Sequence, residues 1–282
     1  MKLDYLIKEI RRQVLTISSA DIGQSNSLNI DVKGLSLNSK EVKKGYLFFC
    51  LSGSRYNGKD FINEASQNGA VAVVIDENIK ERVNKKITVI RVKDIIGCLG
   101  SVANKFYNNH SDNLNMTAVT GTNGKTTITF ILENILSNHN KSVGVIGTIN
   151  YRFNNNVFTA KNTTPDILTI HNFINKMLEN NIKYLLMEVS SHALAQRRIE
   201  GLKFNQAIFT NLSQDHFDYH KTKKRYFMAK SLLFRNYLKE GGVAIINIDD
   251  LYGRRLINSI KKNKKNRILT YGIKRNTDIW II

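Results

Sequence analysis

The sequence predicts an α/β fold in two units, residues 1–110 and 111–282, and three observations support it. From residue 114 onward, apolar β-branched runs alternate with stretches whose apolar residues recur at helical spacing. This alternation is typical of a mostly parallel sheet covered by helices on both faces. The first unit holds further apolar runs of strand length. Residues 108–115, NNHSDNLN, carry almost no apolar side chains and indicate a linker.

The N-terminal unit is expected to be a small α/β domain. A turn at Gly45 leads into a buried strand over 46–51, and a short helix over 60–69 closes at Gly69, which suits the C′ position. The apolar runs at 70–75 and 87–92 predict two more strands, and periodicity predicts a helix over 94–109.

In the second unit we expect strands and helices to alternate. The predicted strands cover 114–120, 142–148, 183–191, 206–212 and 243–249. The predicted helices cover 126–140, 165–180, 223–240 and 250–262, the second with the chain's single proline, Pro165, in its first turn. The resulting central domain has a mostly parallel sheet.

Composition excludes several classes of protein. The chain has 282 residues, of which 42% are hydrophobic, so it can bury a core and is not disordered. Cys50 and Cys98 are too few for a disulfide framework or a cysteine-based zinc site. No apolar run approaches the ~20 residues of a membrane span, and the first residues lack a signal-peptide pattern. We expect a cytoplasmic protein without a membrane partner.

The formal net charge of +19 raises the question of a nucleic-acid partner. The lysines are scattered, apart from the dense run KKNKKNR at 261–267, and no helix-turn-helix or aromatic-basic pattern accompanies them. We therefore expect no nucleic-acid partner. A basic surface equally suits a polyanionic small molecule.

The strongest local signal is the segment TGTNGKTT at 120–127, between a predicted strand and a predicted helix. Glycines let backbone N–H groups close around phosphates, and a helix N-terminus adds partial positive charge. Lys125 can reach the β/γ-phosphates, and the Thr126 hydroxyl can hold Mg²⁺. Val119 stands where the longer phosphate-loop pattern has its first glycine, so the loop is a shorter G-x-x-G-K-T.

A carboxylate and a histidine cluster are expected at the same sheet edge. Glu188 ends the strand YLLMEVSS, and ligands of open parallel sheets bind at the carboxyl ends of the strands. Glu188 could therefore share a Mg²⁺ with Thr126, since this ion prefers oxygen ligands. After another strand, the segment DHFDYH at 215–220 holds two histidines and two acids, which suits a metal or phosphate site.

Together these segments closely resemble the Mur ligases of peptidoglycan synthesis, an ATP-dependent amide-forming family. The resemblance is carried by NTTP at 162–165, by MEVSSHALAQRRIEGLKFNQAIFTNLSQDHFDYH at 187–220, and in the first unit by LSLNSK at 35–40, KKGYLFFCLSG and NGKDFINEASQNGAVAVV. It covers essentially the whole chain. It is specific for the members that add a diamino acid to UDP-N-acetylmuramoyl-L-alanyl-D-glutamate, and it places the protein in cell wall biogenesis, and so in cell shape and cell division.

The resemblance implies a role for each matching position. The ATP phosphates would be wrapped by Gly121, Thr122, Asn123, Gly124, Lys125, Thr126 and Thr127. One Mg²⁺ would be held by Thr126, Glu188 and His216. Lys230 matches the family's carbamylated lysine, whose CO₂ adduct turns an ammonium into a carboxylate able to bind a second Mg²⁺. Uridine nucleotide contacts match Leu37 and Ser39. Muramoyl-dipeptide contacts match Asn162, Thr163, Thr164, Ser190, Gln196 and Arg198.

The implied mechanism passes through an acyl phosphate. ATP phosphorylates the D-glutamate side-chain carboxylate, and the amine of the diamino acid then displaces phosphate. A carboxylate and a triphosphate repel each other, so Lys125 and two Mg²⁺ would supply the cations, with Glu188, His216 and Lys230 completing the catalytic set. The resemblance implies a monomer whose partners are the UDP-precursor and a diamino acid, with diaminopimelate favoured over lysine.

The sequence departs from the family pattern at three places. Asn38-Ser39-Lys40 stands where Asp-Ser-Arg is usual, which removes a bidentate guanidinium, and Asn57-Gly58 stands where Asp-Gly is usual. The chain also ends at Asp278-Ile279-Trp280-Ile281-Ile282, so the family's third domain is expected to be absent. The alternatives are a non-catalytic nucleotide-binding remnant and another ligase of the superfamily, such as folylpolyglutamate synthase, against which the SSHAL and DHFDYH segments argue.

Overall fold

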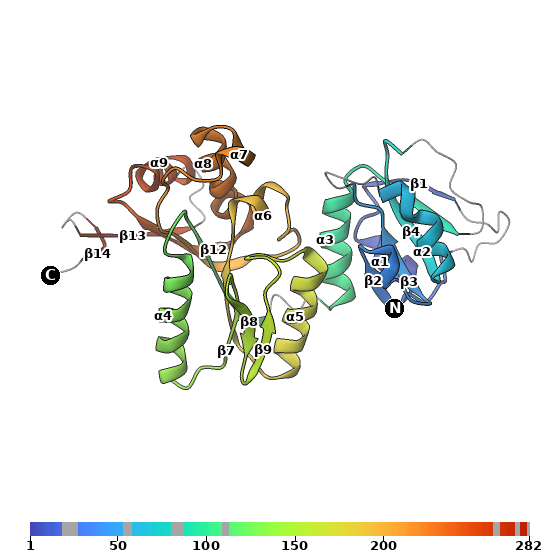
Figure 1. The fold of residues 1–282 in the computed structure, drawn as a ribbon, viewed down its shortest axis with the longest axis horizontal. Coiled ribbons are helices and arrows are strands. Elements are labelled where there is room, and N and C mark those ends of the chain that lie inside the picture. The colour runs from blue at the N-terminus through green and yellow to red at the C-terminus, as the bar shows by residue number, and fades with distance from the viewer. Residues whose placement is uncertain are drawn as a thin grey trace. The chain divides into compact units, whose positions relative to one another are not determined.

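The computed structural model describes residues 1–18, 28–52, 58–79, 87–108, 113–261, 266–273 and 277–280. The chain divides into two compact units, Met1–Asn109 and His110–Ile282 (Figure 1). Each unit is built around its own sheet. Half of the predicted linker, residues 109–112, and Asn57 of the Asn-Gly departure lie outside the described residues.

The first unit is a five-stranded sheet in the order β1-β5-β4-β3-β2, parallel except for β1. The strands are β1 (Val14–Ser18), β2 (Gly34–Ser36), β3 (Tyr46–Phe49), β4 (Ala70–Asp76) and β5 (Thr88–Val92). The helices are α1 (Leu3–Lys8), α2 (Ile62–Gln67) and α3 (Ile95–Phe106), with short 3₁₀ turns η1 (Ser39–Glu41) and η2 (Gly58–Phe61). Gly45 and Gly69 both adopt positive φ, as the predicted turn and helix end require.

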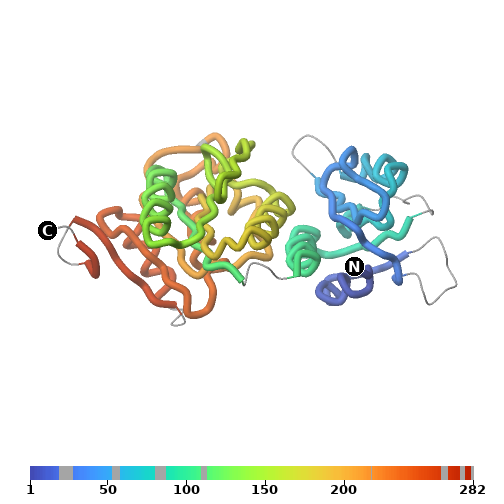
Figure 2. Tube along the Cα trace, turned by 90° about the horizontal axis from the view of Figure 1, so that it is seen from below, coloured from blue at the N-terminus to red at the C-terminus, as the bar shows by residue number. Residues whose placement is uncertain are grey.

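The second unit is a nine-stranded sheet in the order β14-β13-β12-β11-β6-β10-β7-β8-β9. It is parallel except for the hairpin of β8 and β9, which extends one edge, while β13 and β14 form the other (Figure 2). The strands are β6 (Asn115–Thr120), β7 (Val143–Ile146), β8 (Asn150–Phe153), β9 (Asn156–Thr159), β10 (Tyr184–Glu188), β11 (Phe204–Phe209), β12 (Leu238–Asn247), β13 (Arg267–Gly272) and β14 (Ile279–Trp280).

Helices and turns connect these strands. They are α4 (Lys125–Asn138), α5 (Ile167–Glu179), α6 (Ser191–Ala195), α7 (Phe217–His220), α8 (Lys223–Leu232), the π-helical turn η4 (Leu233–Tyr237) and α9 (Leu251–Ile260). The mostly parallel α/β fold predicted from the alternating pattern is thereby confirmed.

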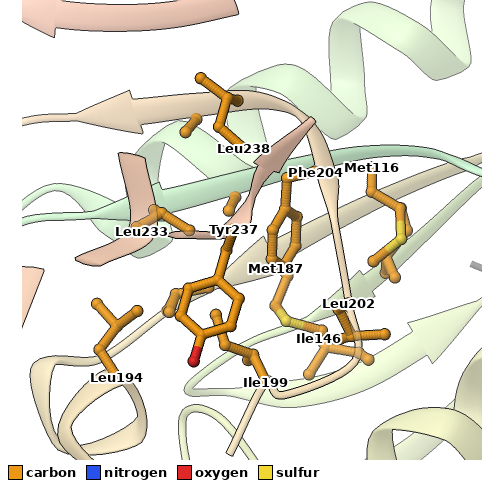
Figure 3. Close-up of a cluster of buried hydrophobic side chains, with 14 of the residues drawn as sticks. Met116, Ile146, Met187, Leu194, Ile199, Leu202, Phe204, Leu233, Tyr237 and Leu238 are labelled. Carbon is orange, nitrogen blue, oxygen red and sulfur yellow. The ribbon is translucent and has the colours of Figure 1, made fainter. Parts of the chain in front are cut away.

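The two faces of the second sheet are covered differently. One face builds the large core, where side chains such as Met187, Phe204 and Leu233 pack together (Figure 3). On the other face Val143, Val145 and Leu186 pack against α4. Strand residues alternate between faces, so Glu188 shares the α4 side with Leu186. The carboxylate of Glu188, at the end of β10, therefore lies beside the start of α4.

Several predicted boundaries are wrong. Pro165 lies before the helix rather than in its first turn, because Asp166 is the N-cap and accepts a hydrogen bond from the Thr169 N–H. The helix predicted over 223–240 stops earlier, because Leu238 pairs with Phe204 in the sheet and starts β12. The strand predicted over 183–191 ends at Glu188, since Ser190 caps α6 through the Ala193 N–H.

Candidate nucleotide and magnesium site

The phosphate loop of the second unit joins β6 to α4. Gly121 has φ +152° and Gly124 has φ +84°, a backbone conformation that favours glycine. A Cβ on Gly121 would lie 1.8 Å from the Thr210 Oγ1. The glycines predicted for close backbone approach are therefore required by the fold itself.

The segment that follows β11 holds the loop in place. Thr210 Oγ1 donates to the Asn123 carbonyl over 2.6 Å, and the Asn211 carbonyl accepts from the Thr122 N–H over 2.9 Å. The Asn211 side chain also accepts from the Asn123 N–H over 3.1 Å. These bonds occupy the N–H groups of Thr122 and Asn123. The first N–H groups of α4 have no partner within the helix, so they remain suited to an anion.

Lys125, the first residue of α4, folds back over the loop. Its Nζ donates to the carbonyls of Gly121 and Thr122 over 3.0 and 2.9 Å. Burial lowers the pKa of Lys125, although the nearby carboxylates of Glu188 and Asp215 act in the opposite direction. A phosphate in the loop would replace these carbonyls with a stronger, charged acceptor.

Glu188 is 1% exposed and is held from two sides. Its Oε2 accepts from Thr126 Oγ1 and from Thr148 Oγ1, each over 2.9 Å, and its Oε1 accepts from the Thr148 N–H over 3.1 Å. A Cβ on Gly147 would lie 2.4 Å from Oε1, so any other residue at this position would clash with the carboxylate. The structure thus brings together Thr126 and Glu188, as the sequence predicts for a shared cation.

The predicted acceptor-substrate residues surround the end of β10. Thr164 Oγ1 donates to the Glu188 carbonyl over 2.9 Å and accepts from the Ser190 N–H over 3.0 Å. Arg198 donates to the Thr164 carbonyl over 2.9 Å and to the Gln196 side chain over 2.8 Å.

The two preceding residues of the same loop lie against neighbouring side chains. Thr163 Oγ1 lies 3.0 Å from Thr148 Oγ1, and the Asn162 carbonyl accepts from the Tyr151 hydroxyl over 2.6 Å. Five of the six predicted residues are therefore linked to the end of β10, directly or through Thr148 and Thr164, whereas Asn162 contacts β8.

The histidines form an aromatic cluster. The His192 ring lies 4.8 Å from that of His216 and 5.5 Å from that of His220. His216 has φ +53° and places its Nε2 3.4 Å from Asp215. His220 is buried, and its Nε2 lies 2.9 Å from Ser191 Oγ. Burial, followed by the charges of His192, Lys230 and His216, lowers the pKa of His220 to about 4.

Lys230 is 1% exposed and lies beneath the phosphate loop. Its Nζ donates to the Gly121 carbonyl over 2.8 Å and lies 4.6 Å from the centre of the Tyr226 ring. Burial, and secondarily the charge of Lys125, lowers the pKa of Lys230 well below its ordinary value, against the opposing charge of Asp215. A cation-binding role for this residue would require its ammonium to be neutralised or modified.

The donor set partly suits magnesium. Thr126 and Glu188 present the oxygen atoms that this ion prefers, and such sites are commonly completed by phosphate oxygens and water. Within the described ranges, no three His, Cys, Asp or Glu side chains are grouped closely enough to hold a metal ion alone. His216 lies in the histidine cluster, beside Asp215 and His192.

In the first unit, the residues predicted for uridine contacts lie on one turn. Leu37 is half-buried, whereas Ser39 is 4% exposed and its hydroxyl hydrogen-bonds to the Glu64 carboxylate. Asn38 caps the turn through the Lys40 N–H over 3.1 Å, which an aspartate would do equally well. Asn38 therefore preserves the turn geometry at this departure.

Sequence reasoning missed several residues of this site. Gly147 and Thr148 follow β7 at the same sheet edge, and Thr210 and Asn211 follow β11 there. The rule that placed Glu188 at a strand end applies equally to these four residues. Tyr226, whose hydroxyl lies 3.1 Å from Thr122 Oγ1, has no such signal because its contact is set by the packing of α8.

The fold and the site define an α/β protein with a phosphate loop at the carboxyl edge of a mostly parallel sheet. Residues 119–281 match the family description Mur ligase middle domain, and residues 31–107 match Mur ligase family, catalytic domain. This chain belongs to the Mur ligase family.

Two relatives with the same name match most of this chain. The UDP-N-acetylmuramoyl-L-alanyl-D-glutamate–2,6-diaminopimelate ligase of Aquifex aeolicus is 46% identical over 88% of this chain and 49% of its own length. The enzyme of the same name from Clostridium tetani is 37% identical over 99% of this chain and 54% of its own. The chain thus spans about half the length of the curated relatives it matches.

A solved structure agrees with these relatives. A structure of a UDP-N-acetylmuramoyl-L-alanyl-D-glutamate–2,6-diaminopimelate ligase superposes with a TM-score of 0.74 at 31% identity, covering 87% of this chain and 49% of the other. No helix among the described residues is both long and apolar enough to cross a membrane.

Proposed function

We propose that this chain provides the nucleotide- and acceptor-binding parts of an ATP-dependent amide ligase. The reaction would join diaminopimelate to the D-glutamate side-chain carboxylate of UDP-N-acetylmuramoyl-L-alanyl-D-glutamate, in cytoplasmic peptidoglycan precursor synthesis. The observation that carries the proposal is the pairing of Thr126, at the start of the phosphate-loop helix, with the buried Glu188. The names of the relatives at 37% and 46% identity supply the substrates and favour diaminopimelate over lysine.

The phosphate loop would bind ATP through residues 121–127. The N–H groups at the start of α4 would receive phosphate oxygens, and Lys125 would turn from the loop carbonyls to the β/γ-phosphates. Thr126 and Glu188 would hold Mg²⁺, with His216 as a further ligand. When bound, this ion neutralises phosphate charge and so reduces the repulsion of the incoming carboxylate.

The acceptor would bind beside the nucleotide. Arg198 and Gln196 lie next to the loop over 162–164, and an arginine suits a carboxylate of the peptide. Leu37 and Ser39 of the first unit would contact the uridine nucleotide. A carboxylate oxygen of D-glutamate then attacks the γ-phosphorus and the bond to ADP breaks. The amine of the diamino acid attacks the acyl carbon, loses a proton, and phosphate leaves.

Lys230 would act as its CO₂ adduct. Burial lowers the pKa of its amine well below the ordinary value and so favours the neutral form, which can attack CO₂, forming an N–C bond and releasing a proton. The product carries a negative charge beneath the phosphate loop, where a second Mg²⁺ would be attracted. The position of Nζ next to the Gly121 carbonyl supports this placement.

The test is a ligation assay read by mass spectrometry. The chain is incubated with ATP, Mg²⁺, the UDP-muramoyl-dipeptide and diaminopimelate, alone and together with the C-terminal half of the Aquifex aeolicus relative as a separate polypeptide. We expect UDP-muramoyl-tripeptide only when both polypeptides are present, because the chain spans about half the length of its relatives. If product is absent from both mixtures, and calorimetry detects neither nucleotide nor UDP-precursor binding, the proposal is wrong.

A further inference from the structure

A directed chain of hydrogen bonds connects the buried Glu188 to the loop over 161–164. Thr163 Oγ1 lies 3.0 Å from Thr148 Oγ1, and Thr148 Oγ1 donates to Glu188 Oε2 over 2.9 Å. A hydroxyl carries a single proton. Because Thr148 gives its proton to the carboxylate, Thr163 must be the donor to Thr148. The chain therefore runs from Thr163 through Thr148 to Glu188.

The neighbouring residue, Thr164, attaches the same loop by another route. Its hydroxyl bonds to the Glu188 carbonyl and the Ser190 N–H, which are main-chain groups. That attachment is independent of what the Glu188 carboxylate binds. The route through Thr148 ends on the carboxylate itself, so only this route depends on the occupancy of the candidate magnesium site.

Glu188 lies between Thr148 and the phosphate-loop helix. Its Oε2 receives hydrogen bonds from both Thr148 and Thr126, while its Oε1 receives the Thr148 N–H. A cation that coordinates Glu188 would hold the carboxylate in one position, and with it the oxygen atom that accepts the hydrogen bond from Thr148. Thr148 is solvent-exposed and is not part of the hydrophobic core.

We propose that Thr148 is a positioning residue that couples the nucleotide site to the acceptor-substrate loop. A magnesium nucleotide bound at the phosphate loop and Glu188 fixes Thr148, and Thr148 orders Thr163 and its neighbours for the acceptor. This inference rests on the proposed function. Coupling between two binding sites is reciprocal, so the acceptor must strengthen nucleotide binding by the same factor.

Hydrogen exchange measured by mass spectrometry tests the coupling directly, with Mg²⁺-ADP as the probe. In the unsubstituted chain we expect the probe to protect peptides covering 121–127 and also those covering 161–166. Thr148→Val keeps the backbone N–H and the side-chain shape but removes the hydroxyl, and it should lose only the protection at 161–166. Thr148→Ser should restore it, and Thr159→Val, an exposed position in β9, should behave like the unsubstituted chain.

Calorimetry of the UDP-muramoyl-dipeptide, with and without Mg²⁺-ADP, gives the coupling factor. We expect about 5-fold or more for the unsubstituted chain and Thr148→Ser, and a value near one for Thr148→Val. Equal coupling in Thr148→Val, or none in the unsubstituted chain although both ligands bind, overturns the inference. If Mg²⁺-ADP fails to protect even residues 121–127, the proposed function is wrong instead.

Discussion

Lys125 and Lys230 donate hydrogen bonds to the same carbonyl oxygen, that of Gly121, over 3.0 and 2.8 Å. Two ammonium groups on one acceptor repel each other, and burial adds to the cost of each charge. Burial lowers the pKa of each lysine, and the charge of Lys125 lowers that of Lys230 further. The phosphate loop thus gathers two amines at the place where a polyanion would bind.

The first prediction is that Lys230 forms a carbamate. Burial lowers its pKa, which favours the neutral, nucleophilic form of the amine that attacks CO₂. After incubation with ¹³C-bicarbonate and Mg²⁺-ADP, NMR should show a carbamate carbon that Lys230→Ala lacks and that the exposed-site control Lys161→Ala retains. No carbamate signal in the unsubstituted chain, or an equal signal in Lys230→Ala, contradicts the prediction.

The second prediction concerns Gly147. Alanine at this position would place its Cβ 2.4 Å from Glu188 Oε1 and displace the carboxylate. Gly147→Ala should weaken Mg²⁺-ADP binding by about tenfold, the loss of one charge-assisted contact, as measured by calorimetry. In a Glu188→Ala background the same substitution should have little further effect. A full additional loss in that background would show that Gly147 acts elsewhere, and thermal unfolding checks that each variant is folded.

The third prediction is a pH dependence from His220. Its pKa is lowered to about 4 in the folded chain by burial and by the charges of His192, Lys230 and His216. Between this value and its ordinary pKa of about 6.5 the unfolded chain binds more protons, so the free energy of unfolding should decrease as pH falls from 6.5 to 4. Urea unfolding at pH 7 and pH 5 should show a smaller decrease for His220→Gln than for the exposed-site control His139→Gln. Equal decreases would contradict the prediction.

The sequence predicted β6, β7, β10, β11 and β12 of the parallel sheet because most of their residues are buried and apolar. It missed β13 and β14, whose residues are partly or largely exposed and so lack a continuous apolar pattern. Strand ends also placed Thr126 beside Glu188, since the carboxyl ends of β6 and β10 meet at one edge. These relationships depend on local pattern and on a general rule of topology. They need no knowledge of side-chain packing.

Other features of the fold could not be predicted from the sequence, because they depend on contacts between residues that are distant along the chain. The hairpin of β8 and β9 was missed although Asn154, with φ +49°, marks its turn, because its strands are short and are stabilised by Tyr151 and Phe158 packing on Phe173 of α5. The early end of α8 follows from a strand pairing made across the sheet. The position of the Tyr226 hydroxyl against Thr122 likewise follows only from the folded arrangement.

The central claim is that residues 121–127 bind the phosphates of a magnesium nucleotide. Calorimetry of Mg²⁺-ATP tests it most directly with the unsubstituted chain, Lys125→Ala and the exposed-site control Lys141→Ala. A charge-assisted hydrogen bond is worth about 1.5–3 kcal/mol, so Lys125→Ala should bind at least about tenfold more weakly. Lys141→Ala should bind like the unsubstituted chain. Equal affinity of Lys125→Ala and the unsubstituted chain would contradict the account.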